Sequence, residues 1–202
     1  RIPLFYYSDY IDVGYAMPWI EAPQAVYGDG PFKSMQGINI TYSQPLGPLD
    51  SQIQIYAGNN DEEIVLPNFS LDLKMDNITG MSWAIGYEWI EFRATYFLAE
   101  STGSNEQFDQ LFTTLFDPTL GLGAVLGGDY VDDLRWEEDE PTFAGIGINM
   151  DWGDYFILSE ATQVRNGDNI VAADVNSYYI TFGTRIIDDW TFAITYTRED
   201  DE

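Results

Sequence analysis

The residue pattern at positions 190–198 constrains the fold of this chain more than any other feature. Apolar side chains occupy every second position from Trp190 to Tyr196, and Thr or Ala fills the positions between them. Successive side chains of a β-strand point to opposite faces, so this period of two predicts an amphipathic strand. Residues 81–98, 144–158 and 178–196 repeat the pattern as pairs of strands that meet at a short turn flanked by Trp or Tyr.

The polar face of these strand pairs indicates their surroundings. A soluble antiparallel sheet also alternates, but its apolar face forms the protein core and has little need for Trp and Tyr beside the turns. In a transmembrane barrel the apolar face meets lipid, the small and polar face meets a wet lumen, and Trp and Tyr collect at headgroup level. The pattern therefore favours a membrane barrel.

The composition is compatible with this prediction. The chain has 202 residues, which suits one domain, and it has no apolar run long enough for a transmembrane helix. A barrel strand needs only about 9–11 residues, of which every second one is apolar. The aromatic content of 16% would supply two interfacial belts, and a mean hydropathy of -0.20 is expected when lumen and loops dilute the lipid face.

The charge excludes nucleic acid as a partner, because phosphate binding needs a basic surface. Eight basic and 34 acidic side chains give a formal net charge of -26. Most of the acidic residues fall outside the expected strands, where they are hydrated and where they could loosely bind Ca²⁺ or attract other cations. They gather at 61–63, 132–133, 137–140, 168, 174 and 199–202.

The residues that usually perform catalysis are missing. The chain contains no Cys and no His, which removes thiolate chemistry, the usual zinc ligand and the Ser-His-Asp triad. Carboxylate pairs exist at Glu88 with Glu91 and at Asp151 with Asp154, but both flank expected tight turns. We therefore expect no enzymatic activity and no cofactor.

About nine strands are expected, joined by connections that alternate between long and short. One long connection, at 59–80, joins the third and fourth strands, and residues 105–116 have the apolar spacing of a short amphipathic helix. Such alternation is typical of up-and-down barrels of the outer membrane. The expected strands are residues 2–7, 37–44, 51–58, 81–88, 90–99, 142–151, 154–165, 175–186 and 190–198.

The strand pairs, the loop alternation and residues 1–37 resemble the porins of Gram-negative outer membranes. The resemblance implies an all-β transmembrane antiparallel barrel, with residues 8–36 as an inward constriction loop and 101–141 as a long extracellular loop. It also implies passive diffusion of ions and small hydrophilic solutes, contact with outer-membrane lipid and lipopolysaccharide, and a homotrimer.

The chain departs from the porin pattern in two respects. Porins have more strands than the nine expected here, and they end on an aromatic residue, whereas this sequence ends in REDDE. We therefore expect residues 1–202 to form a single but partial barrel domain, because open sheet edges are not tolerated in lipid.

The resemblance also implies the residues of the ion path. Acidic residues of the inward loop would face arginines of the wall, and the acidic excess would favour cations. The loop residues are Asp9, Asp12, Glu21 and Asp29, and the wall residues are Arg93 and Arg185. The expected interfacial aromatic residues are Trp83, Trp89, Trp152, Tyr155 and Trp190.

Two other functions stay open from the sequence. A soluble or surface-attached all-β module could bind calcium or carbohydrate through the acidic loops, although no EF-hand loop is present. A barrel that does not conduct could serve as an adhesin or a phage receptor. Each residue of the expected ion path also has a purely structural alternative, such as anchoring the loop to the wall.

Overall fold

The computed structural model describes residues 17–19, 21–27, 35–65, 70–104, 139–167, 173–187 and 190–201. These residues form one four-residue helix and eight strands. The elements are α2 (Gln24–Tyr27), β1 (Gln36–Leu46), β2 (Leu49–Val65), β3 (Ser70–Tyr87), β4 (Ile90–Ser104), β5 (Thr142–Asp151), β6 (Tyr155–Arg165), β7 (Val175–Ile187) and β8 (Trp190–Asp201).

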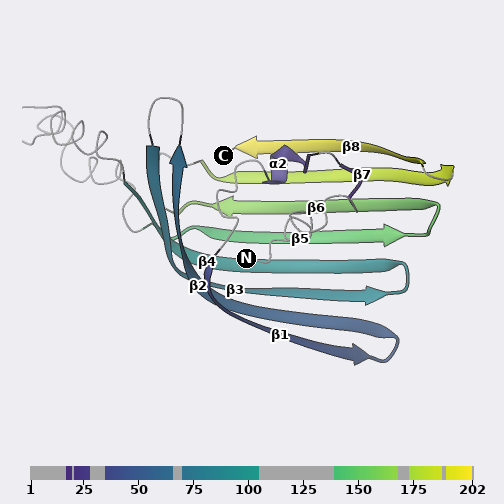
Figure 1. The fold of residues 1–202 in the computed structure, drawn as a ribbon, viewed down its shortest axis with the longest axis horizontal. Helices are drawn as coiled ribbons and strands as arrows, with labels where there is room; N and C mark the ends of the chain where they lie inside the picture. The colour runs from purple at the N-terminus through teal and green to yellow at the C-terminus, as the bar shows by residue number, and fades with distance from the viewer. Residues whose placement is uncertain are drawn as a thin grey trace, which may run out of the picture.

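All eight strands belong to one antiparallel sheet in which each strand pairs with its neighbour in sequence, in the order β1-β2-β3-β4-β5-β6-β7-β8. Figure 1 shows them side by side, with β1 and β8 at opposite edges. The predicted all-β, up-and-down architecture is confirmed. The sheet is open and does not close into a barrel, and the strand expected at 2–7 and the helix expected at 105–116 lie outside the described residues.

The prediction of a long loop at 59–80 is wrong, because β2 continues to Val65 and β3 begins at Ser70. The polar and acidic side chains suggested a loop, but they alternate with buried ones: Asn60, Leu73 and Met75 all point inward. A bulge at Asn77, whose φ is 53°, keeps Ile78 and Met75 on the same side. In Figure 1 the far ends of β2 and β3 bend away from the sheet as an arm.

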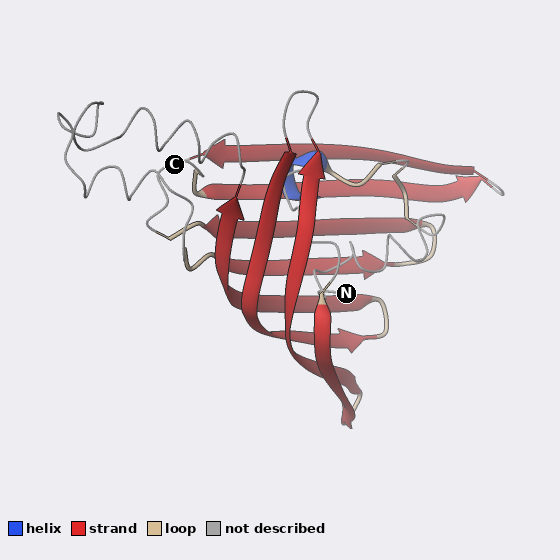
Figure 2. Ribbon diagram, turned by 60° about the vertical axis from the view of Figure 1, so that its left-hand side comes forward, coloured by secondary structure: helices blue, strands red, loops and turns tan. Residues whose placement is uncertain are grey.

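The sheet is curved, as Figure 2 shows. Its two faces carry different side chains, in the way that the alternation predicts. The convex face carries large exposed apolar side chains; Ile38 is 71% and Ile194 is 73% exposed. The concave face, towards which the sheet curls and on which α2 lies, carries small, polar and buried residues. The exposed convex set includes Ile40, Tyr42, Ile53, Ile55, Trp83, Phe92, Tyr96, Ile146, Ile180, Phe182, Phe192 and Tyr196.

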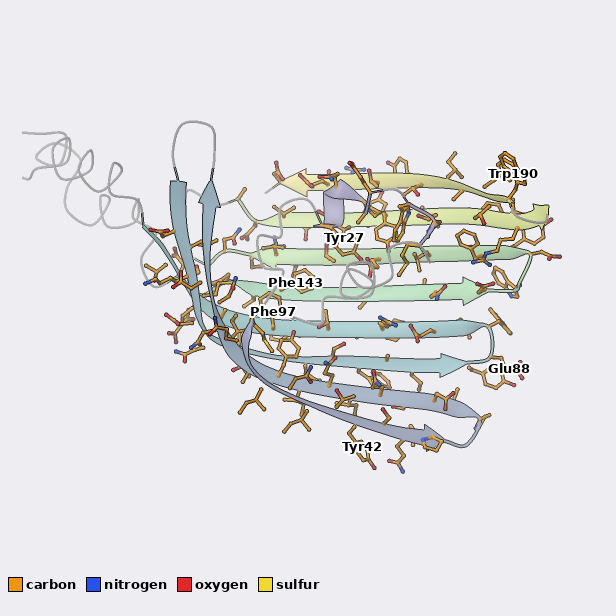
Figure 3. All side chains as sticks on the ribbon, viewed as in Figure 1. Tyr27, Tyr42, Glu88, Phe97, Phe143 and Trp190 are labelled. Carbon is orange, nitrogen blue, oxygen red and sulfur yellow. The ribbon has the colours of Figure 1, made fainter. Side chains whose placement is uncertain are left out.

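The core of the molecule lies on the concave face. One cluster gathers around Tyr56 and Phe97, and the other gathers around Leu158 and Tyr179. Phe143 packs against both clusters, and its ring stacks on that of Phe97 at 5.3 Å between centroids. Figure 3 labels both side chains, which come from the neighbouring strands β4 and β5. Buried apolar residues therefore share this face with hydroxyl and amide side chains.

Two glycines permit the aromatic packing on the concave face. A Cβ atom at Gly80 would overlap the ring of Tyr56, and one at Gly183 would overlap the ring of Phe156. Each ring comes from the neighbouring strand of its glycine, since β2 pairs with β3 and β6 with β7. A glycine inside a strand marks such a close approach.

The line that joins the short turns runs at an angle to the rows of hydrogen-bonded residues that cross the sheet. One row passes through Gly86, next to the end of β3 at Tyr87. The same row continues through Glu91, Asn149, Leu158 and Thr181 and reaches Thr195, well inside β8, which begins at Trp190. The strands are thus tilted relative to the line of turns, as in sheets that form barrels.

Candidate functional site

The five aromatic residues expected at a membrane interface all lie on the convex side or at the short turns, and all are exposed. Trp89 stacks on Trp152 from the next turn, with 5.2 Å between ring centroids. Tyr155 stacks on Phe182, and Trp190 stacks on Phe192. Trp83 lies further inside β3, where its Nε1 donates a hydrogen bond of 3.0 Å to Ser51 Oγ. Four of the five therefore follow the edge of the short turns.

Further tyrosines lie on the convex face, nearer the opposite ends of the strands. Tyr178 on β7 and Tyr196 on β8 are diagonal neighbours, with 6.1 Å between their ring centroids. Tyr96 is exposed on β4. From the sequence these tyrosines were predicted only as members of the apolar pattern, although Tyr at both ends of an apolar stripe is a signal for a second interfacial belt.

The two wall arginines lie on the concave side, as the alternation predicts, and each pairs with a carboxylate near the short turns. Arg93 Nε is 2.6 Å from Glu91 Oε1. Arg185 Nη1 donates to both carboxylate oxygens of Asp151 at 3.0 Å and to the carbonyl of Gly153 at 3.1 Å, and its guanidinium lies 4.4 Å from the centroid of the Phe156 ring. Glu91 and Asp151 are therefore engaged in ion pairs with the wall.

Residues 17–19 and 21–27 lie on the concave face against β6, β7 and β8. Trp19 Nε1 donates to Thr181 Oγ1 at 3.0 Å and to Thr195 Oγ1 at 3.2 Å. These two threonines face each other across β7 and β8, with 2.8 Å between their hydroxyl oxygens. The edge of the Trp19 ring packs on Tyr179 at 5.3 Å between centroids. Trp19 thus joins the segment to two strands.

The second anchor of this segment is Tyr27 at the end of α2. Its hydroxyl donates a hydrogen bond to the carboxylate of Glu160, which is only 1% exposed. The Tyr27 ring packs on Tyr179, with 6.2 Å between centroids. A buried carboxylate is costly unless it accepts hydrogen bonds, so this contact stabilises the docked segment as well as the charge.

The acidic residues expected in the inward loop are only partly described. Glu21 is exposed and lies between the two anchors Trp19 and Tyr27. Asp9, Asp12 and Asp29 lie outside the described residues. The alternation of β6 places Glu160 on the polar, concave side, as the structure has it, but it does not give the contact of Glu160 with Tyr27. Sequence reasoning missed the contacts of Thr181 and Thr195 with Trp19.

A hollow of about 610 Å³ opens on the concave face near the short turns of β1–β5. Its volume lies in the range of small-molecule sites. Its lining is polar and includes the ion pair of Glu91 with Arg93. The other polar lining residues are Ser43, Gln44, Asp50, Ser51, Gln52, Glu88, Asn149 and Asp151.

Among the residues that the structure describes, no group of three or more Asp, Glu, His or Cys side chains is placed to hold a metal ion. No helix in the described part of the chain is both long and apolar enough to cross a membrane. Comparisons with protein-family models, with curated proteins and with solved structures found no match to this chain.

Proposed function

We propose that this chain forms part of the wall of a porin in the outer membrane of a Gram-negative bacterium. The channel is water-filled and allows passive diffusion of ions and small hydrophilic solutes, with a preference for cations. The proposal assigns no catalytic activity and no cofactor to the chain. Its partners are outer-membrane lipid, lipopolysaccharide and further copies in a trimer, as the resemblance to porins implies.

The observation that carries the proposal is that the large apolar side chains of the sheet are exposed, whereas a soluble sheet would bury them. Its convex face exposes large apolar side chains on each of the eight strands, many more than the scattered apolar residues of a soluble protein surface. Exposed aromatic residues follow the short turns at one edge of this surface. Strands β1, β5 and β6 have 11, 10 and 11 residues, the length that a tilted strand needs to cross a bilayer.

The open edges of the sheet set a requirement on this proposal. Within a bilayer every backbone N–H and C=O group must be hydrogen-bonded, so a spanning sheet has to be closed. β1 and β8 each pair on one side only. The proposed wall therefore needs additional strands between β8 and β1 to complete the barrel.

Cation preference follows from the side chains around the concave hollow. Four carboxylates line it, from Asp50, Glu88, Glu91 and Asp151, together with the guanidinium of Arg93. A passage with an excess of negative charge concentrates cations and repels anions. Current through planar bilayers with a salt gradient would give the sign of the selectivity.

The test of membrane embedding compares tryptophans on the two faces. In single-tryptophan variants reconstituted into vesicles, brominated lipid should quench Trp89, Trp152 and Trp190, which are exposed on the convex side or at the turns. Trp19, which lies on the concave face, is the matched control and should be quenched much less. Equal quenching of Trp19 and Trp190, or none of either, would exclude a lipid-facing convex surface.

A further inference from the structure

The hollow on the concave face has a floor of very small residues. Ala84 and Gly86 of β3 form this floor, and Glu88, labelled in Figure 3, lies in the turn beside it. A Cβ atom added to Gly86 would have the carbonyl oxygen of Ile90 as its nearest neighbour, at 3.7 Å. The space above this glycine is therefore open, and a ligand can approach the backbone of β3 closely.

Polar side chains flank the floor of the hollow on both sides. In one hydrogen-bonded row, Gly86 lies between Asp50 of β2 and Glu91 of β4. In the next row on the same face, Gln52 and Arg93 take the same two places. Neighbouring strands lie about 4.8 Å apart, so the two flanks stand about 10 Å from each other across β3. A ring-sized ligand can therefore lie on the floor and reach both flanks with its edges.

The flanks of the hollow present mainly hydrogen-bond acceptors. A carboxylate only accepts, with about four lone-pair sites, so Glu91 can accept hydrogen bonds in addition to the one from Arg93. Gln52 Nε2 donates to Ser43 Oγ at 3.1 Å, and the carbonyl oxygen of the same amide is an acceptor. Asp50 on the same flank is exposed. A ligand that fits the hollow must therefore bring several donors.

The carboxylates of the hollow are not arranged to hold a compact cation. Asp50 and Glu91 stand on opposite flanks, and in the described part of the chain no three acidic side chains are placed to hold a metal ion. Glu91 and Asp151 are already paired with Arg93 and Arg185. An anion would be repelled, since four carboxylates and one guanidinium line the hollow. The donors are therefore best supplied by a neutral molecule.

We propose that the hollow is a binding site for a neutral mono- or disaccharide, with one sugar ring lying over Ala84 and Gly86. Hydroxyls on one edge of the ring donate to Asp50 and Gln52, and hydroxyls on the opposite edge donate to Glu91. Hydrogen bonds to a carboxylate are the stronger kind, and the volume of the hollow is within the range of small-molecule sites. The site goes beyond the proposed channel function, because a sugar can bind to the concave face whether or not the protein conducts.

Filling the floor of the hollow tests the site without removing a polar group. The folded protein in detergent is titrated with maltose, and the heat of binding is measured by isothermal titration calorimetry. Gly86→Val should weaken binding at least ~10-fold, because the added side chain takes the place of the sugar ring. The fold should tolerate this change, since the space above Gly86 is open and Val suits a strand.

Thr41→Val is the matched control for this substitution. It places the same side chain on the concave side of β1, at a residue that does not line the hollow, and it should leave maltose binding unchanged. Gly86→Ala adds only one carbon to the floor, so it should weaken binding less than Gly86→Val. This smaller variant keeps the test decisive if Gly86→Val does not fold.

The charge of the ligand is tested on one flank. Asp50→Asn keeps the shape of the side chain and removes its charge, so it should weaken maltose binding about 5-fold, as a charge-assisted hydrogen bond becomes a neutral one. The diamine 1,4-diaminobutane is titrated in parallel as the cationic probe. Binding of this diamine that Asp50→Asn abolishes, together with no binding of maltose, would overturn the saccharide and assign the hollow to organic cations.

The outcomes separate this inference from the proposed function. Protein that conducts cations in bilayers but binds neither maltose nor sucrose would overturn the saccharide site and leave the porin intact. Maltose binding that Gly86→Val and Gly86→Ala leave unchanged would place the sugar elsewhere and overturn the site as well. Folded protein that binds maltose with the expected loss in Gly86→Val, but carries no current, would support the site and overturn the channel function.

Discussion

The convex and concave faces of this sheet are built from the same eight strands but have opposite relations to solvent. The convex face exposes its large apolar side chains, whereas the concave face buries Tyr179, Thr181 and Glu160 beneath residues 17–19 and 21–27. In a soluble sheet the apolar face would be the covered one. The difference shows that the alternation alone does not tell which face of a sheet is covered.

The largest effect is expected from a charge on the convex face. In the proposed porin, Ile40→Arg should destabilise the folded protein in vesicles by about 2–4 kcal/mol, the cost of Arg on a strand surface that faces lipid near the bilayer midplane. Thr41→Arg is the matched control, because the neighbouring residue points to the concave side, and it should cost far less. The free energy of unfolding in urea measures both, and similar losses would contradict the assignment of the two faces.

A smaller loss is expected from filling the space under an aromatic ring on the concave face. Gly183→Ala should destabilise the protein by about 1–3 kcal/mol, because the added methyl group overlaps the ring of Phe156. In Gly86→Ala the added carbon would have its nearest atom, the carbonyl oxygen of Ile90, at 3.7 Å, so this variant should be nearly neutral. Thermal unfolding of the two variants in the same detergent would show the contrast, and a neutral Gly183→Ala would mean that the ring moves freely.

The smallest effect is expected from the ion pair of Arg185 with Asp151. Arg185→Gln should lower the free energy of unfolding by about 0.5–1 kcal/mol, because the two side chains are 40% and 45% exposed and solvent screens their attraction. The same variant should increase cation preference, since it removes a positive charge from the concave side. Reversal potentials in a salt gradient test this, and Arg198→Gln, on an exposed pair with Asp200, is the control for charge removal in general.

Much of the fold could be predicted from the sequence because its signal is local. The alternation of Trp190, Phe192 and Ile194 with threonine and alanine gives the strand and its two faces without any knowledge of partners. The error at 59–80 has the opposite cause. There the polar residues of β2 and β3 resemble a loop, and only pairing with the neighbouring strand shows that Leu73 and Met75 are buried.

The docked segment was harder to predict for a similar reason. Trp19 meets Thr181 across 162 positions of sequence, and Tyr27 meets Glu160 across 133. No periodicity connects residues so far apart, and neither threonine differs from the others on its strand. The alternation of side chains along each strand is enough to place Arg93 and Arg185 on the concave side. Their partners Glu91 and Asp151 follow only from the register of the strands at the turns.

The row of hydrogen-bonded residues that starts at Gly86, near one turn, ends at Thr195, well inside the last strand. This offset between the row and the line of turns has a consequence for the width of a barrel that such a sheet could form. When a sheet with such an offset closes, the row returns to its starting strand at a different height, and the circumference depends on that offset as well as on the number of strands. Strands added between β8 and β1 must continue the same offset to keep their turns in line. In the proposed barrel, the backbone geometry would therefore fix the width of the channel before any side chain enters it.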